Sequence, residues 1–177
     1  MTIQLTRRFI AVLMLAVMMF TGCGAAQTPD VPLDDILTAI KNAYGDDYMP
    51  NGEIPAELLE AEFGLTPDMY DDVRGEMAMI TMFNDRVVLV KAKNGKADDV
   101  EKALTNARDL KIADTLQYPM NVPKTNAAKV VRQGNYIAFL MLGKNNDNMD
   151  DVSDESAKAF AEEQVQIGVH AFENSLK

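Results

Sequence analysis

The chain has 177 residues, of which 47% are hydrophobic, and its 17 basic and 27 acidic residues give a formal net charge of −10. This acidity argues against a nucleic-acid partner, because binding to nucleic acid depends on basic side chains that neutralise phosphates. The sequence holds one cysteine, so no intramolecular disulfide can form and the fold must be stabilised by its hydrophobic core.

The N-terminal segment has the pattern of a secretory signal. Arg7 and Arg8 give it a positive charge, and residues 9–20 (FIAVLMLAVMMF) are apolar without interruption. A helix of this length rises about 18 Å, which is too short for a hydrocarbon core of about 30 Å. We therefore predict that residues 1–22 are a signal peptide and not a membrane span.

The predicted signal ends in a site suited to lipid attachment. The sequence FTGC, ending at Cys23, resembles a lipobox, the motif at which bacterial lipoproteins receive a lipid on cysteine and are cut before it, although Phe20 replaces the usual Leu. We predict a fatty-acid anchor such as palmitate on Cys23 and a short tether over residues 23–30. The protein would then lie on the extracytoplasmic side of the cell membrane. The alternative is an ordinary secretory signal with a chance cysteine.

Helices dominate the first part of the chain that follows the tether. Apolar residues at helical spacing predict a helix over residues 31–44, which Gly45 ends. A second helix is expected over residues 55–63. Residues 66–68 (TPD) predict the start of a third helix, with Thr66 as its N-cap.

Two predicted pairs of strands follow, and each pair leads into a helix. The first pair and its helix are expected over residues 77–83, 86–93 and 95–117, and the second set over residues 127–133, 136–143 and 154–176. Residues 136–142 (YIAFLML) are apolar on both faces, which predicts the central strand. Lys91 and Lys93 predict that the strand over residues 86–93 has one solvent-facing side.

The order β-β-α-β-β-α predicts an α+β domain over residues 31–177, with an antiparallel sheet of about four strands, packed helices and an N-terminal helical segment. Strand alternation places Phe139 on one face of the sheet and Ala138 on the other. We expect the long helices to cover one face and the N-terminal helical segment to cover the other.

Several segments of the chain resemble the DUF4358 family. The resemblance lies in IKNAYGDDYMPN, VKAKNGKADDVEKAL, LQYPMNVP, VVRQGNYIAFLMLG and EEQVQIGV, which begin at residues 40, 90, 116, 130 and 162. The family consists of predicted lipoproteins of Clostridia-like Gram-positive bacteria, and its function is unknown. The resemblance therefore implies an envelope location and supplies no catalytic residue.

The residues needed for common catalytic chemistries are scarce. A serine hydrolase needs a nucleophile, a base and an orienting group, but His170 is the one histidine of the chain and no G-x-S-x-G motif is present. Zinc would find one histidine and no free cysteine. Paired carboxylates are inevitable among 27 acidic residues, so a carboxylate-dependent hydrolase is a remote alternative. We expect no catalytic residue, no cofactor and no enzymatic activity.

Two ion-binding sites were weighed against simpler explanations. Asp147, Asp150, Asp151 and Asp154 crowd together before the last predicted helix and are candidate Ca²⁺ ligands, but acidic residues also favour a helix N-terminus without any ion. Residues 77–82 carry Met77, Met79 and Met82, a pattern typical of Cu(I) sites. Strand alternation would place Met82 on the opposite face from the other two, so core packing is the preferred explanation.

These observations predict a non-catalytic binding or accessory module of the cell envelope, anchored to the membrane, with an envelope protein as a possible partner. A solute- or ion-binding lipoprotein is the main alternative. A solute binder would need a concave polar pocket, whereas an assembly partner would expose an apolar patch rimmed by polar residues.

Overall fold

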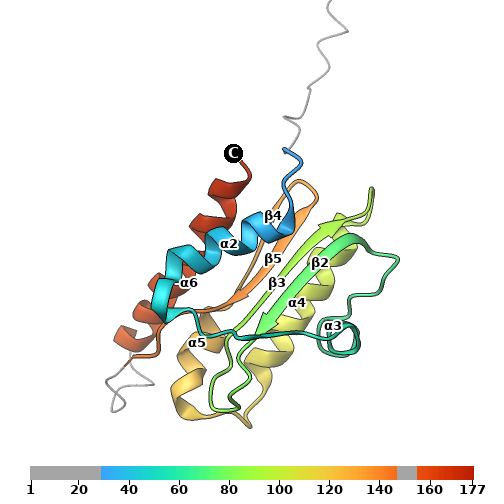
Figure 1. Cartoon of the computed structure of the whole chain (residues 1–177). Helices are drawn as coiled ribbons and strands as arrows, with labels where there is room; N and C mark the ends of the chain where they lie inside the picture. Colours follow the sequence, from blue (N-terminus) through green and yellow to red (C-terminus); the bar gives the residue numbers. More distant parts are fainter. Residues whose placement is uncertain (1–28, 147–154) are drawn as a thin grey trace, which may run out of the picture.

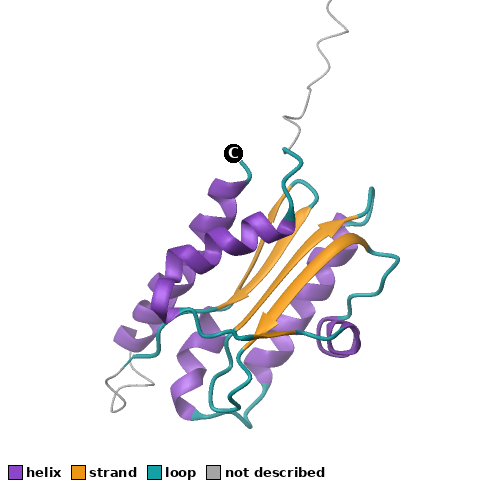
Figure 2. Ribbon diagram, viewed as in Figure 1, coloured by secondary structure: helices purple, strands orange, loops and turns teal. Residues whose placement is uncertain are grey.

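The computed structural model describes residues 29–146 and 155–177 and contains a five-stranded antiparallel sheet with helices on both faces (Figures 1 and 2). The helices are α2 (Leu33–Tyr44), α3 (Ala56–Phe63), α4 (Ala97–Ala113), α5 (Val122–Ala127) and α6 (Glu155–Ser175), with short 3-10 turns at η2 (Gly45–Asp47) and η3 (Pro119–Asn121). The strands are β1 (Gly52–Glu53), β2 (Tyr70–Met77), β3 (Arg86–Ala92), β4 (Lys129–Gln133) and β5 (Tyr136–Met141). The expected α+β class and antiparallel sheet are confirmed, with five strands instead of about four.

The strand order is β1-β2-β3-β5-β4, so β3 lies at the centre of the sheet and β5 lies beside it. In the β3–β5 pair, Val88 faces Phe139 and Val90 faces Ile137. Every residue of β5 is buried, as predicted from its apolar faces. The prediction that β5 is the central strand is wrong, because the hairpin partner β4 occupies the edge next to it.

One face of the sheet is covered by α2 and α6, which pack against each other (Figure 1). Strand residues such as Leu89 and Ala138 meet the apolar stripe of α2 there. The two helices approach closely at Gly168, where an added Cβ would lie 2.9 Å from the Tyr44 hydroxyl. That hydroxyl accepts a hydrogen bond from the Gly168 N–H and donates one to the Gln164 carbonyl. The absence of a side chain at Gly168 therefore allows α6 to approach α2 closely.

The other face is covered by α3 and α4. Phe139 packs edge-on against Phe63 of α3, with the ring centroids 5.2 Å apart, and its neighbours include the buried side chains of Val100 and Leu104 from α4. The two long helices, α4 and α6, thus lie on opposite faces, and the expectation that they share one face is wrong. The reason is that each of the two hairpins is followed by a helix that crosses to a different side.

The largest departure from the predicted elements concerns the first hairpin. Residues 66–68 form a turn instead of a helix start, and β2 begins at Tyr70. This strand has alternating charged residues, Asp72, Arg74 and Glu76, on its α2 side, so it lacks the apolar run that marks a buried strand. Met77, the first residue of that expected strand, ends β2 and packs against the core, and residues 78–83 lie in the β2–β3 loop. Met79 and Met82 are exposed on that loop, so they do not serve the core packing expected of them.

The structure also corrects the expected exposure of β3 and the expected first residue of β4. The four valine and leucine residues of β3 are fully buried, so this strand does not have a solvent-facing side as expected. The strand expected from residue 127 begins at Lys129, because residues 122–127 form helix α5 with Pro123 in its first turn.

The first described residues are fixed to one end of the sheet. Asp30 forms an ion pair with Lys91 near the end of β3. The Tyr136 hydroxyl accepts a hydrogen bond from the Val31 N–H at 2.9 Å. The chain therefore enters the domain at the Lys91 end of β3, at the upper end of the sheet in Figure 1.

Replacing a core aromatic tests this arrangement. Phe139→Ala should lower the free energy of unfolding by about 3–5 kcal/mol, because it leaves a cavity lined by Phe63 and the apolar side chains of α4. Lys91→Ala, which removes a partly exposed ion pair, should cost no more than about 1 kcal/mol. Denaturant unfolding of the chain from residue 24 onward measures both changes, and equal effects would contradict the assigned core.

Candidate functional site

The residues that the sequence singled out are only partly within the described chain. Cys23 and the acidic residues Asp147, Asp150, Asp151 and Asp154 lie outside it. Within residues 29–146 and 155–177, no group of three potential metal-ligating acidic, histidine or cysteine side chains comes together. His170 is exposed on α6. None of the helices in the described part has the length and apolar character needed to cross a bilayer.

The structure places a groove of about 480 Å³ at the end of the sheet where β3 begins. One wall is the β2–β3 loop (residues 78–85), and the other is the connection from α4 to α5 (residues 114–121). Arg86 and Met141, from the adjoining ends of β3 and β5, form part of its floor. Figure 1 shows this end of the sheet opposite the end where the N-terminal segment enters. We call this feature the loop groove.

Apolar side chains stand exposed along the loop groove. Met79 is 61% exposed, Leu116 is 92% exposed and Tyr118 is 54% exposed, and all three line it. Large apolar side chains at this exposure are unusual when several occur side by side. The groove therefore has an apolar rim formed by two loops that are distant in the sequence.

Short polar contacts hold the two walls in place. Asn121, on η3, donates a hydrogen bond from Nδ2 to the Met82 carbonyl at 2.9 Å. Asn84 donates from Nδ2 to the Thr125 hydroxyl at 2.6 Å. The Thr125 hydroxyl lies 2.7 Å from Gln117 Oε1, to which it donates. These bonds join the β2–β3 loop to η3 and α5, so the walls keep a defined separation.

Three residues that line the loop groove each have one buried polar atom without a hydrogen-bond partner among the described residues. These atoms are Asn84 Oδ1, Asn121 Oδ1 and Arg86 Nε. Asn121 is only 3% exposed, so its amide oxygen is cut off from bulk water by the protein around it. A buried polar atom left unpaired costs about 1–3 kcal/mol. In folded proteins such atoms are usually satisfied by ordered water.

One wall of the groove carries two cations that share one carboxylate. Lys111 Nζ donates a hydrogen bond to Glu62 Oε2 at 2.9 Å, and Arg86 Nε lies 3.6 Å from the same oxygen, beyond hydrogen-bond distance. The Lys111 ammonium also lies 5.1 Å from the centre of the Phe63 ring. Asp114 also lines the groove, so its two cationic and two anionic side chains balance.

Burial and charge act on the protonation of this cluster in opposite directions. Burial alone would raise the pKa of the Glu62 carboxyl, but the hydrogen bond from Lys111 and the nearby Arg86 charge outweigh it and hold that pKa below its ordinary value. Burial lowers the pKa of the Lys111 ammonium, while the bond to Glu62 opposes the change. Glu62 is therefore an ionised ion-pair partner at neutral pH and a poor general acid.

A second ion pair lies on the other side of β3. Lys124 Nζ donates to Asp85 Oδ2 at 2.6 Å, and both side chains are almost fully buried. Burial raises the pKa of the Asp85 carboxyl, although the Lys124 charge opposes this shift. The pair joins the last residue of the β2–β3 loop to α5, so it fixes the base of the loop groove instead of lining it.

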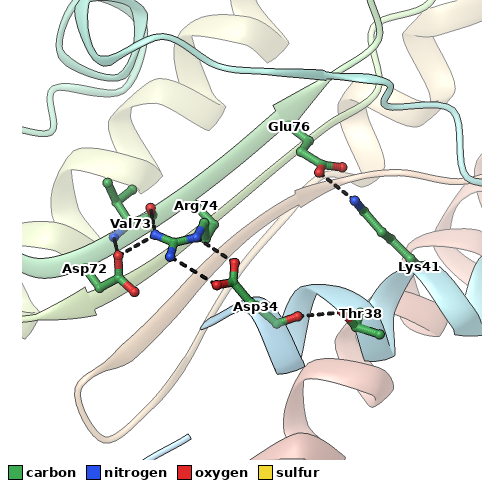
Figure 3. Close-up of polar contacts among 7 residues, drawn as sticks. All are labelled: Asp34, Thr38, Lys41, Asp72, Val73, Arg74 and Glu76. Carbon is green, nitrogen blue, oxygen red and sulfur yellow. Dashed lines mark hydrogen bonds and ion pairs between the residues drawn. The ribbon is translucent and has the colours of Figure 1, made fainter. Parts of the chain in front are cut away.

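A second groove, of about 470 Å³, runs between α2 and the outer strands. Figure 3 shows the polar contacts between α2 and β2 there. Arg74 bridges Asp34 of α2 and Asp72 of its own strand, and Lys41 donates to Glu76 at 2.6 Å. Each of these charges is already paired within the protein. We interpret this groove as the polar contact that docks α2 on β2.

Sequence reasoning missed the loop groove, because it assigned residues 77–83 to a buried strand. A signal was present in the broken phase of the α4 pattern after Leu110 and in the apolar residues Leu116 and Tyr118 beside Pro119. Neither signal shows that two loops meet in space. Only the sheet register brings them together.

Comparison with known proteins yields one match. A family model described as "Domain of unknown function (DUF4358)" matches residues 43–142. This range includes α3, α4, α5 and all five strands, and therefore the whole of the loop groove. No curated protein and no solved structure matches the chain significantly.

The charge cluster makes a prediction about acid stability. An ionised Glu62 with a lowered pKa stabilises the fold above its ordinary pKa of 4.5, and this contribution is lost as the pH falls through the lower folded-state value. Glu62→Gln should thus cost about 1–3 kcal/mol at pH 7, and this cost should shrink as the pH falls below 4.5. Glu60→Gln, an exposed change on the same helix, should have little effect at either pH. A cost for Glu62→Gln that is independent of pH in urea melts would contradict this assignment.

Proposed function

The chain belongs to the DUF4358 family, and from this premise we propose that it is a non-enzymatic binding module, tethered to the extracytoplasmic face of the cell membrane through a lipid on Cys23, with the loop groove as its binding site. The observation that carries the proposal is the groove itself, a hollow between two loops that are distant in the sequence, along which large apolar side chains stand exposed. Its volume of about 480 Å³ falls within the ordinary range of ligand sites, about 300–1,000 Å³.

The position of the groove supports the tethered arrangement. Asp30 is fixed near Lys91, and the groove begins at Arg86, so the two lie at opposite ends of β3. Five strand residues at about 3.3 Å each separate them by roughly 17 Å. A lipid on Cys23 would therefore hold the domain with its groove directed away from the bilayer. Apolar loops at that end are then placed to meet a ligand or a partner and not the lipid.

Carboxylate catalysis receives less support from the same residues. A general acid in a cleft needs a carboxyl with a raised pKa. Glu62 lines the loop groove, but its pKa is lowered by Lys111 and Arg86. Asp85 has a raised pKa, but it is buried against Lys124 beneath the groove. A binding role needs neither group to exchange protons.

The lipid anchor can be tested directly. Cys23→Ala should abolish incorporation of an alkyne fatty acid supplied to growing cells, because the thiol that accepts the lipid is removed. The altered protein should remain as an unprocessed precursor or be released from the membrane. In-gel fluorescence after click labelling measures the incorporation. Equal labelling of the unaltered protein and Cys23→Ala would remove the anchor from the proposal.

The binding site can be tested by photo-crosslinking in the native envelope. A benzoylphenylalanine at position 116 should yield a crosslinked adduct, because Leu116 lines the groove. The same group at position 110 should yield none, because Leu110 is 71% exposed on α4 but lies outside the groove. Gel mobility and mass spectrometry identify the adducts. The absence of an adduct at position 116, or the same adducts at both positions, would contradict a binding role for the groove.

A further inference from the structure

The two edges of the sheet differ in what covers them. At one edge, β1 is only two residues long and pairs with the last two residues of β2. The Ile54 N–H extends this pairing to the Gly75 carbonyl, and the chain then turns at Pro55, which has no N–H to donate, into α3. Residues 70–74 of β2 therefore have no strand on their outer side in the described part of the chain.

Side chains occupy the backbone groups that this short β1 leaves uncovered. The Gly75 carbonyl is directed outward to Ile54, so strand alternation directs the N–H and carbonyl of Val73 outward as well. The Val73 N–H donates to Asp72 Oδ1 at 2.9 Å, and Arg74 Nη1 donates to the Val73 carbonyl at 2.9 Å. Arg74 Nη1 also donates to Asp72 Oδ1 (Figure 3). These two side chains, which we call the edge clamp, thus make both hydrogen bonds that a neighbouring strand would make.

A residue of α2 fixes the position of the edge clamp. Asp34 accepts hydrogen bonds from Arg74 Nε at 2.7 Å and from Arg74 Nη2 at 3.2 Å. Paired bonds of this kind set the plane of the guanidinium, which leaves Nη1 for Val73. The groove of about 470 Å³ described above lies beside this edge, and Val73 is among the residues that line it. The space next to the edge is therefore open, and only side chains close its backbone.

The opposite edge of the sheet is β4, and no strand lies beyond it among the described residues. This strand (KVVRQ) has five residues, as many as the uncovered segment of β2 (YDDVR). Most charges of the two segments are already paired, Arg132 of β4 with α4 and Arg74 with Asp34. Lys129 and Asp71, in contrast, form no ion pair with another described residue. Each edge thus retains one uncompensated charge, and the two charges have opposite signs.

We propose that residues 70–74 of β2 are a docking edge for β4 of a second copy of this chain, and that the edge clamp keeps this edge closed. With the clamp in place, the Val73 backbone is occupied and the edges do not pair. Without it, Val73 has a free donor and a free acceptor, and such an edge accepts a strand from another chain. Since β2 and β4 lie toward opposite edges of the sheet, copies that pair in this way join head to tail.

The test measures the mass of the full-length chain in detergent micelles by sedimentation velocity at increasing protein concentration. Arg74→Ala frees the Val73 carbonyl, and Asp72→Ala frees the Val73 N–H. The unaltered chain should remain monomeric, whereas both variants should form dimers and larger species as the concentration rises. Lys41→Ala is the matched control, because it breaks a neighbouring ion pair between α2 and β2 but touches no group of Val73. It should remain monomeric.

A second substitution places the association at β4. Gln133 and Tyr136 flank a two-residue turn and face each other in the β4–β5 register, so they exchange hydrogen bonds and the Arg132 N–H points outward. Proline at position 132 removes that outward donor without breaking the bonds to β5. The double variant Arg74→Ala/Arg132→Pro should therefore return to the monomeric mass.

Far-UV circular dichroism identifies any variant that has lost its fold. If Arg74→Ala unfolds, Asp72→Ala decides, because it leaves the pair between Arg74 and Asp34 in place. Monomeric behaviour of the folded variants, or association that Arg132→Pro does not change, would overturn the proposal. Loss of the fold in both single variants would overturn it too, because the clamp would then serve stability alone. The two grooves share no lining residue, so none of these results bears on the loop groove as a binding site.

Discussion

The burial of β3 and β5 on both faces is the constraint on which the rest of the structure depends. Every side chain from Val87 to Val90 is inaccessible to solvent, and β5 is buried throughout. Two helix layers are needed to cover these strands, so α2 and α6 must lie on one side and α3 and α4 on the other. Because helices cover both faces, the loops that connect the elements lie at the two ends of the β3–β5 pair. One end receives the N-terminal segment, and the other carries the loop groove.

The loop groove lies at one end of these buried strands, but its side chains are less completely buried and less completely hydrogen-bonded than those of the strands. Buried strands satisfy their polar groups through the ladder, whereas Asn84, Asn121 and Arg86 each keep one buried polar atom without a partner in the described chain. Apolar side chains that a core would bury are exposed a few residues away. Exposed apolar side chains that gather at one place on a surface are typical of interaction sites.

Sequence patterns predicted the elements whose burial is regular. The apolar stripe of α2, the continuous run of β5 and the helical spacing of α6 each follow from the side of the element that faces the core. β2 was missed because its charges, Asp72 among them, face α2 and pair there, so its pattern resembles a turn and not a strand. The run after Met77 was assigned to a strand because periodicity cannot tell a buried apolar segment from one exposed for binding. The groove was beyond prediction, since it exists only where register joins two loops far apart in the sequence.

We propose that the end of the domain opposite the point where the N-terminal segment enters is the surface that engages a ligand. Hydrogen–deuterium exchange of the protein in its native membrane, compared with the purified protein in nanodiscs, tests this claim most directly. Added protection in the native membrane should be confined to residues 78–85 and 114–121, the two walls of the loop groove. Equal exchange in both states, or protection that instead gathers at α2 and the β4–β5 turn near the tether, would contradict it.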